Sequence, residues 1–294
     1  MNESPIFIVG NPRSGTTLFR LMLACNGKIV VPPEGGFAVW LASKYSGYEP
    51  ERIVSEARTI AESIMTCKKM DTWRLPTKSV VTEIENGQPQ TWANVVDLVY
   101  RLYAKQSGKP LARWGDKNNF YLNHIEDLLT LFPNAQFLHV VRDPRNVAAS
   151  YRRINLAEIT GQYAPNLPDK AEEMAHHWLS NVTKVVDSLD ALPPAQALHV
   201  RYEDLTNDPR ETLSDVCGFL GESFDSRMLD FHHYNKALQL EPPETMAWKE
   251  KTLSPVQASD SSGFSDVIAP SEAKTISNAC STLMQRFHYD GSNS

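Results

Sequence analysis

The chain has 294 residues, of which 41% are hydrophobic and 22% are charged, values typical of a globular protein with one large core, so we expect a single domain over residues 1–294. The formal net charge of −6 argues against a nucleic-acid partner, because general nucleic-acid binding usually requires a basic excess. No window approaches the roughly 18 consecutive apolar residues of a membrane span, and residues 1–5 leave no room for a signal peptide, so we expect a cytoplasmic protein without a membrane partner.

In chain order, short apolar runs typical of β-strands alternate with runs of helical periodicity. The predicted strands are residues 6–9, 29–31, 111–114, 136–141 and 197–201. The predicted helices are residues 16–25, 91–106, 123–132, 146–158, 171–189 and 209–220. This alternation is typical of an α/β fold in which crossover helices flank a mostly parallel sheet.

The first predicted strand runs into a loop of small residues that opens the first predicted helix. This arrangement points backbone N–H groups and a helix dipole at one anion, so the loop is suited to phosphate. The spacing from Gly10 to Gly15 is that of the nucleotide-triphosphatase loop G-x-x-x-x-G-K-S/T, yet Thr16 occupies the lysine position. The only cation of the loop is Arg13. The alternative interpretation is an ordinary strand-to-helix turn.

The fourth predicted strand is followed by a second group of anion-binding residue types. The strand ends near Arg142, and Ser150 lies eight positions further on, two turns into the next predicted helix. A guanidinium and a hydroxyl at this spacing can bind an anion. Because ligands of an open parallel sheet collect at the carboxyl ends of its strands, both anion sites can belong to one ligand. In the intervening turn, Asp143 and Arg145 are expected to pair with each other.

Together these motifs resemble those of the sulfotransferases that use 3′-phosphoadenosine 5′-phosphosulfate (PAPS). The family's 5′-phosphosulfate loop, P-R/K-S-G-T-T, is matched by residues 12–17, and its 3′-phosphate element is matched by Arg142 and Ser150. The resemblance runs from about residue 6 to about residue 220 and is closest to the tyrosylprotein sulfotransferase branch and its soluble bacterial relatives. The R-Y-E-D-L stretch at 201–205 is also similar, and in the family its Tyr lies near the nucleotide. The nucleotide-binding residues implied by the resemblance are Arg13, Ser14, Gly15, Thr16, Thr17, Arg142, Ser150 and Tyr202.

The same resemblance implies three catalytic residues. Glu34, 21 positions beyond Arg13, stands where the tyrosylprotein branch carries its general base. Lys117 lies in a segment similar to the family's second cationic motif, G-x-K-x-P or N-K-D-P, although Asn119 replaces the expected Pro. Arg13 and Lys117 would then stabilise the charge on the leaving oxygen. From the residues alone, a solvated loop acid at Glu34 and a surface lysine at Lys117 remain alternatives.

The implied activity is transfer of a sulfuryl group from PAPS to a hydroxyl acceptor, with release of adenosine 3′,5′-bisphosphate (PAP). The acceptor can be a peptide tyrosine, a glycan, a lipid or a small molecule, and the resemblance allows a homodimer. Two protein cations with the loop N–H groups can replace the Mg²⁺ of phosphoryl transfer, so no metal is expected. The alternatives are a P-loop phosphotransferase and a protein that binds the nucleotide without turnover.

The regions around these motifs are expected to cover the site. Residues 35–90, irregular over 75–90, are expected to form a cap over the acceptor. Residues 241–270 are expected to be a long loop that folds over the nucleotide. By analogy with the family, this loop can supply Lys249 or Lys251 to the 3′-phosphate.

The C-terminal part is expected to close the fold with one helix over residues 271–287 and a frayed tail over 291–294. The cysteines are scattered without the spacing of a zinc site or a disulfide framework, so we expect free thiols. These cysteines are Cys25, Cys67, Cys217 and Cys280.

Overall fold

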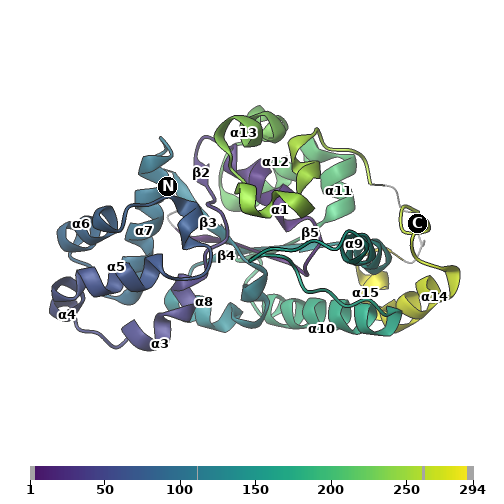
Figure 1. Ribbon diagram of the computed structural model, residues 1–294, viewed down its shortest axis with the longest axis horizontal. Helices are drawn as coiled ribbons and strands as arrows, with labels where there is room; N and C mark the ends of the chain where they lie inside the picture. The colour runs from purple at the N-terminus through teal and green to yellow at the C-terminus, as the bar shows by residue number, and fades with distance from the viewer. Residues whose placement is uncertain (1–3, 111, 260–261, 290–294) are drawn as a thin grey trace.

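Figure 1 shows the computed structural model, in which helices cover both faces of a five-stranded sheet. The structure describes residues 4–110, 112–259 and 262–289. The strands are β1 (Ile6–Val9), β2 (Ile29–Val30), β3 (Arg113–Lys117), β4 (Gln136–Val141) and β5 (Ala197–Arg201). Their order is β2-β3-β1-β4-β5, and every neighbouring pair is parallel. The predicted α/β fold is therefore confirmed.

The third strand differs from its prediction, which placed it at residues 111–114. The structure begins β3 at Arg113 and continues it to Lys117, and Leu111 lies outside the described residues. The strand continues past Trp114 because the polar residue Asp116 has partners inside the fold, where Oδ2 of its carboxylate accepts hydrogen bonds from two buried tyrosine hydroxyls. This extension places Lys117 at the carboxyl end of the sheet.

Alternate residues of β1 face opposite sides of the sheet. Ile6 and Ile8 pack against the helices of one side, and Phe7 and Val9 pack against those of the other. The first side is covered by α1 (Thr16–Ala24), α11 (Tyr202–Asn207), α12 (Pro209–Leu220) and α13 (Phe231–Leu238). The helices of the second side include α8 (Ile125–Leu131) and α10 (Ala171–Asp190), with α9 (Pro144–Leu156) packed on α10.

A group of short helices forms one end of the molecule and is called the cap below (Figure 1). The cap consists of α2 (Phe37–Trp40), α3 (Ala42–Tyr45), α4 (Pro50–Ser55), α5 (Ala57–Met65), η1 (Met70–Trp73), α6 (Thr77–Gly87) and α7 (Trp92–Gln106). The prediction of an irregular segment over 75–90 is wrong, because α6 occupies most of it. Val80 and Ile84 lie one helical turn apart and are both buried, so a narrow apolar stripe stabilises this otherwise polar helix.

The predicted loop over 241–270 contains regular structure. Two 3₁₀-helices, η4 (Pro243–Trp248) and η5 (Glu250–Leu253), occupy its first half. They are held by a buried side chain, since Asn235 of α13 donates to the hydroxyl of Thr252 at 3.1 Å. This half of the segment is therefore part of the packed fold.

The single helix predicted over 271–287 is divided into α14 (Pro270–Ala279) and α15 (Ser281–Arg286). The break falls at Cys280, whose buried thiol lies 3.7 Å from a carbonyl oxygen of α10. This contact holds the chain against α10 at the residue between the two helices. All four cysteines are free thiols, as predicted. The predicted tail over 291–294 lies outside the described residues.

The buried apolar side chains form three clusters. One lies between the cap and the sheet, one between the sheet and α1 with α12, and one among α9, α10 and α14. Along the described part of the chain, no helix combines the length and the apolar character needed to cross a bilayer. The carboxyl ends of the parallel strands lie at one edge of the sheet, which is where ligands of such sheets bind.

Candidate active site

The loop after β1 lies at the N-terminus of α1. Its last residue, Gly15, has a φ angle of 93°, in the left-handed region that favours glycine, and offers no side chain to cap the helix. The first N–H groups of an α-helix have no partner within the helix, so those of α1 can face an anion. The hydroxyl of Ser14 is buried and makes no hydrogen bond to a described residue. This geometry suits an anionic ligand.

Arg13 joins this loop to distant parts of the chain. Its Nε donates to Oγ of Ser150 in α9 at 3.1 Å, and its Nη2 donates to the carbonyl of Trp248 at 3.1 Å. The carbonyl of Arg13 accepts a hydrogen bond from Nη1 of Arg142 at 3.2 Å. Burial, followed by the nearby charge of Arg142, lowers the pKa of Arg13 to about 10. An anion bound to both guanidinium groups would offset this repulsion.

Arg142, directly after β4, has one hydrogen-bond donor without a partner in the described chain. Its Nε is buried and makes no hydrogen bond within the described chain, while its guanidinium carbon lies 4.3 Å from the ring centre of Tyr202. The same ring packs on Gly15, where an added Cβ would lie 2.2 Å from it, so only glycine fits there. Tyr202 therefore lies between the loop and Arg142. As predicted, Arg145 pairs with Asp143, at 2.6 Å.

The two lysines considered for the 3′-phosphate lie in different parts of the site. Burial lowers the pKa of Lys251, and so do the charges of Arg142 and other nearby arginines. The Lys251 ammonium group is therefore within electrostatic range of Arg142. Lys249 instead pairs with the buried carboxylate of Glu241.

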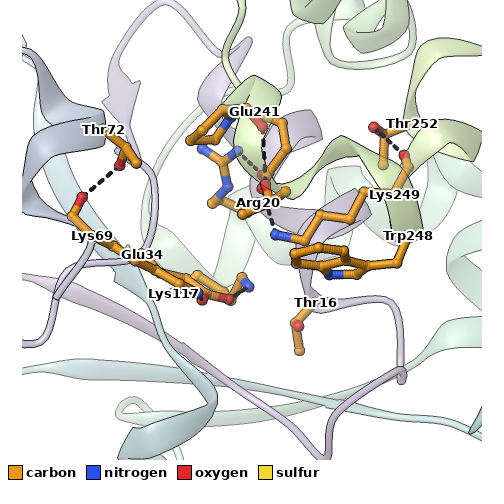
Figure 2. A network of polar contacts seen from close by, with 12 residues as sticks. Thr16, Arg20, Glu34, Lys69, Thr72, Lys117, Glu241, Trp248, Lys249 and Thr252 are labelled. Atoms are coloured by element: carbon orange, nitrogen blue, oxygen red, sulfur yellow. Dashed lines mark hydrogen bonds and ion pairs between the residues drawn. The ribbon is translucent and has the colours of Figure 1, made fainter. Parts of the chain in front are cut away.

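Glu34 follows β2, and its carboxylate pairs with Lys69 of the cap and with Lys117 at the end of β3 (Figure 2). The side chain of Glu34 is 14% exposed and that of Lys117 is 2% exposed, so neither is a solvated surface group. Burial alone would raise the pKa of Glu34, but the ammonium groups of Lys117, Lys249 and Lys69 outweigh it and hold the pKa well below its ordinary value. Burial lowers the pKa of Lys117 to about 8, against the opposing effect of Glu34.

A second buried carboxylate, that of Glu241, lies next to this group. It accepts from Arg20 at 2.6 Å and from Oγ1 of Thr245 at 2.5 Å, and it also pairs with Lys249. Burial alone would raise the pKa of Glu241, but the charges of Lys249, Arg20 and Lys117 lower it to about 2. Two carboxylates and their cations thus share one charged region.

The loop after β1 and the Glu34 pair are connected. Oγ1 of Thr16 donates to Oδ1 of Asn119 at 3.4 Å, and Asn119 lies two positions after Lys117, the partner of Glu34. Thr17 is half-buried in the first turn of α1. The residues that the sequence motifs singled out therefore lie along one edge of the sheet.

Sequence reasoning missed Lys69, Arg20 and Glu241. Lys69 is 35 positions from Glu34 and reaches it from a residue with a φ angle of 70°, for which the sequence holds no signal. Arg20 is a lone charge in a helix of mostly apolar residues, and this pattern indicates a buried partner. That partner is 221 positions away, so only the tertiary structure identifies it.

Comparison with known proteins agrees with this geometry. The sequence profile of the Sulfotransferase family matches residues 5–226. The chain is 24% identical over 251 residues to the omega-hydroxy-beta-dihydromenaquinone-9 sulfotransferase Stf3 of Mycobacterium bovis. The alignment covers 74% of this chain and 63% of that protein. The chain is also 26% identical over 231 residues to the protein-tyrosine sulfotransferase A of Caenorhabditis elegans. This alignment covers 78% of this chain and 52% of that protein.

A solved structure with a similar fold is the sulfotransferase domain of the Synechococcus PCC 7002 olefin synthase. Its TM-score is 0.59 at 22% identity, with 98% of this chain and 97% of that chain covered. The chain spans less than two thirds of the length of each of the two proteins named above, from Mycobacterium bovis and Caenorhabditis elegans. Because the family profile covers most of the chain, including the loop after β1, the chain belongs to the sulfotransferase family.

Proposed function

We propose that this chain transfers a sulfuryl group from PAPS to the hydroxyl group of an acceptor. The observation that carries the proposal is the position of Arg13, which joins the loop at α1 to Ser150 and lies beside Arg142. One ligand with anionic groups at two ends, such as PAPS, satisfies both guanidinium groups. The ring of Tyr202, packed on Arg142 and on Gly15, then borders the bound nucleotide.

In this proposal each anionic end of the donor has its own ligands. The 5′-phosphosulfate binds to the first N–H groups of α1 and to Arg13, and the 3′-phosphate binds to Arg142, Ser150 and Lys251. The unpartnered donors Oγ of Ser14 and Nε of Arg142 support this fit, since buried polar groups normally have a partner. Protein cations take the role that Mg²⁺ has in phosphoryl transfer.

During transfer, the bond between sulfur and the bridging oxygen of PAPS breaks, and a bond between sulfur and the acceptor oxygen forms. The acceptor proton passes to Glu34, and PAP leaves with the electron pair of the broken bond. Arg13 and Lys117 stabilise the charge that grows on the bridging oxygen. Because Lys117 and Lys69 pair with Glu34 in the structure, Glu34 becomes a stronger base when Lys117 turns to the donor.

The acceptor reaches Glu34 from the cap side. Lys69 and Thr72 of the cap, with Pro242 and Thr245 of the C-terminal region, line a small cavity next to Glu34. Two relatives are named for a menaquinone derivative and for protein tyrosine. The proposal therefore covers hydroxyl acceptors as a class, including peptide tyrosine, lipid, glycan and small-molecule hydroxyls.

The donor is tested first, by thermal unfolding with PAP, with AMP, and with ATP plus Mg²⁺. PAP should raise Tm the most, because a ligand that binds only the native state stabilises it by mass action. AMP should have a smaller effect, since it lacks the 3′-phosphate. A larger shift with ATP and Mg²⁺ than with PAP would overturn the proposal in favour of a P-loop phosphotransferase.

Transfer is then tested with ³⁵S-labelled PAPS and a panel of phenols, tyrosine peptides, sugars and hydroxylated lipids. A labelled sulfate ester, mapped by mass spectrometry, is the expected product. Binding of PAP with neither transfer to the panel nor hydrolysis of PAPS would indicate a nucleotide-binding protein without turnover.

A further inference from the structure

Lys249 is a buried cation with no assigned role in donor binding. Its side chain is 8% exposed, and its Nζ pairs with the carboxylate of Glu241 (Figure 2). The same carboxylate accepts from Nη2 of Arg20 at 2.6 Å. Glu241 therefore has two cationic partners.

Arg20 alone is enough to neutralise Glu241. The Arg20 side chain is 1% exposed and is held in place by the carbonyls of Val31 at 3.0 Å and of Leu240 at 2.9 Å. Lys249 is a second cation on the same carboxylate, and it adds a buried positive charge that this ion pair does not need. Burying an uncompensated charge costs free energy, so Lys249 is expected to bind an anionic ligand.

The same excess of positive charge surrounds Glu34, which pairs with both Lys69 and Lys117. Each of these two carboxylates thus pairs with two cations, so the paired cations outnumber the carboxylates that they contact by two. A PAPS phosphosulfate carries two negative charges between its phosphate and its sulfate. The charge balance of the region therefore fits the reacting end of the donor.

Lys249 also lies between the donor loop and Glu34. The residue before it, Trp248, accepts a hydrogen bond from Arg13 through its carbonyl at 3.1 Å. Lys249 and Glu34 line the same small cavity. The charge of Lys249 lowers the pKa of both Glu34 and Lys117, which is the electrostatic sign of its closeness to them.

We propose that Lys249 is a third catalytic cation, which binds the sulfuryl oxygens as they pass from PAPS to the acceptor, and that Glu241 and Arg20 position it. This inference rests on the proposed function. The bonds that break and form are those given above, and the acceptor proton still passes to Glu34. Lys249 keeps its own proton and supplies only charge and N–H donors to the transition state.

The test compares K249M and K249Q with the unchanged protein, using PAPS as donor and 2-naphthol as a probe acceptor. Hydrolysis of PAPS, in which water is the acceptor, is measured alongside, so the assay does not depend on the natural acceptor. We expect kcat to fall by about 10²- to 10³-fold, the usual effect of removing one transition-state donor. The Kd for PAP, which lacks the sulfuryl group, should change by less than about threefold. K249R, which retains the charge, should restore part of kcat.

Two lysine variants serve as controls. K236M removes an exposed lysine of α13 and should leave kcat unchanged. K251M removes the lysine near Arg142 and should weaken PAP binding, the opposite pattern to K249M. Because the pair of Arg20 and Glu241 stays neutral without Lys249, K249M should fold. If K249M does not fold, K249Q replaces it in the test, since its side chain keeps an N–H group for Glu241.

The inference is wrong if both folded variants keep kcat within about threefold of the unchanged protein, a difference below 1 kcal/mol. It is also wrong if they lose PAP affinity as much as turnover, because Lys249 would then be a nucleotide ligand. Failure of the unchanged protein to bind PAP would instead overturn the proposed function itself. The two failures are distinguishable, since the latter needs no variant.

Discussion

The proposed donor side and the proposed acceptor side of this site are built in different ways. The proposed donor ligands lie mainly in two short segments, residues 12–17 after β1 and residues 142–150 after β4, which are neighbouring strands. The charges around the proposed acceptor site come instead from four separate segments. They are contributed by Glu34, Lys69, Lys117 and Lys249.

This difference has a physical cause. Much of a phosphate site is backbone, because the N–H groups at the start of a helix bind any anion, so a short local motif is sufficient to build it. A site that activates a hydroxyl and holds a moving sulfuryl group needs side-chain charges on several sides, and no single segment can place them. The acceptor side is therefore expected to be the more sensitive to single substitutions in turnover, and the donor side in binding.

The largest effect is expected from E34Q on the acceptor side. Loss of the general base should lower kcat by about 10²- to 10⁴-fold, while PAP affinity should not fall. Turnover and PAP binding are measured by radiolabel transfer and calorimetry. E62Q, at an exposed glutamate of α5, is the matched control and should behave like the unchanged protein. Normal turnover in E34Q would show that another group is the base.

On the donor side, R142A should act on binding. Removal of a charged donor pair should weaken PAP binding by about 10- to 100-fold, because hydrogen bonds to charged groups contribute about 1.5–3 kcal/mol. AMP binding should change far less. R145A is the control, since Arg145 pairs with Asp143 and should leave the preference for PAP over AMP intact. Equal affinity of the unchanged protein for PAP and AMP would contradict the 3′-phosphate assignment.

The pH dependence of kcat/KM tests the role of Lys117. Lys117 is charged below its pKa of about 8 and neutral above it, so kcat/KM should fall about tenfold per pH unit above that value. In K117R the alkaline limb should move to higher pH, because a guanidinium does not lose its proton in this range. An alkaline limb that stays in place in K117R would show that a different group titrates.

The smallest effect is expected where the cap meets the chain after α9. The hydroxyl of Tyr163 donates to Asp71 of the cap at 3.1 Å. Y163F should cost about 1 kcal/mol of stability, because Asp71 is exposed and water weakens its hydrogen bond, and should raise the acceptor KM by no more than about fivefold. Donor KM should be unchanged. A change in donor KM larger than in acceptor KM would mean that the cap also shapes the donor side.

Much of the fold followed from local patterns. β1, β4 and β5 were predicted with the bounds that the structure has, because each is a short apolar run between polar or small residues. β3 was misplaced because its buried polar residue, Asp116, is stabilised by hydroxyls of Tyr100 and Tyr121 that no local pattern identifies. The helix α6 was missed because only Val80 and Ile84 mark its buried side.

The candidate site divides in the same way. Arg13, Arg142 and Ser150 were predicted from motif and spacing, and the structure brings the first and last into contact. Lys69 and Glu241 carry no local signal, because their importance depends on partners far away in the chain. Lys249 and Lys251 are lysines of one segment, and their different surroundings become visible only in the folded structure.

By itself the sequence determined the parallel α/β architecture, the anion-binding loop and the resemblance to sulfotransferases, because each depends on residues close together in the chain. Only the tertiary structure decided which charges surround Glu34 and that Lys249 lies beside it. The physical reason is that local patterns govern backbone conformation, whereas the electrostatics of a buried site depend on side chains from segments that meet only when the chain is folded.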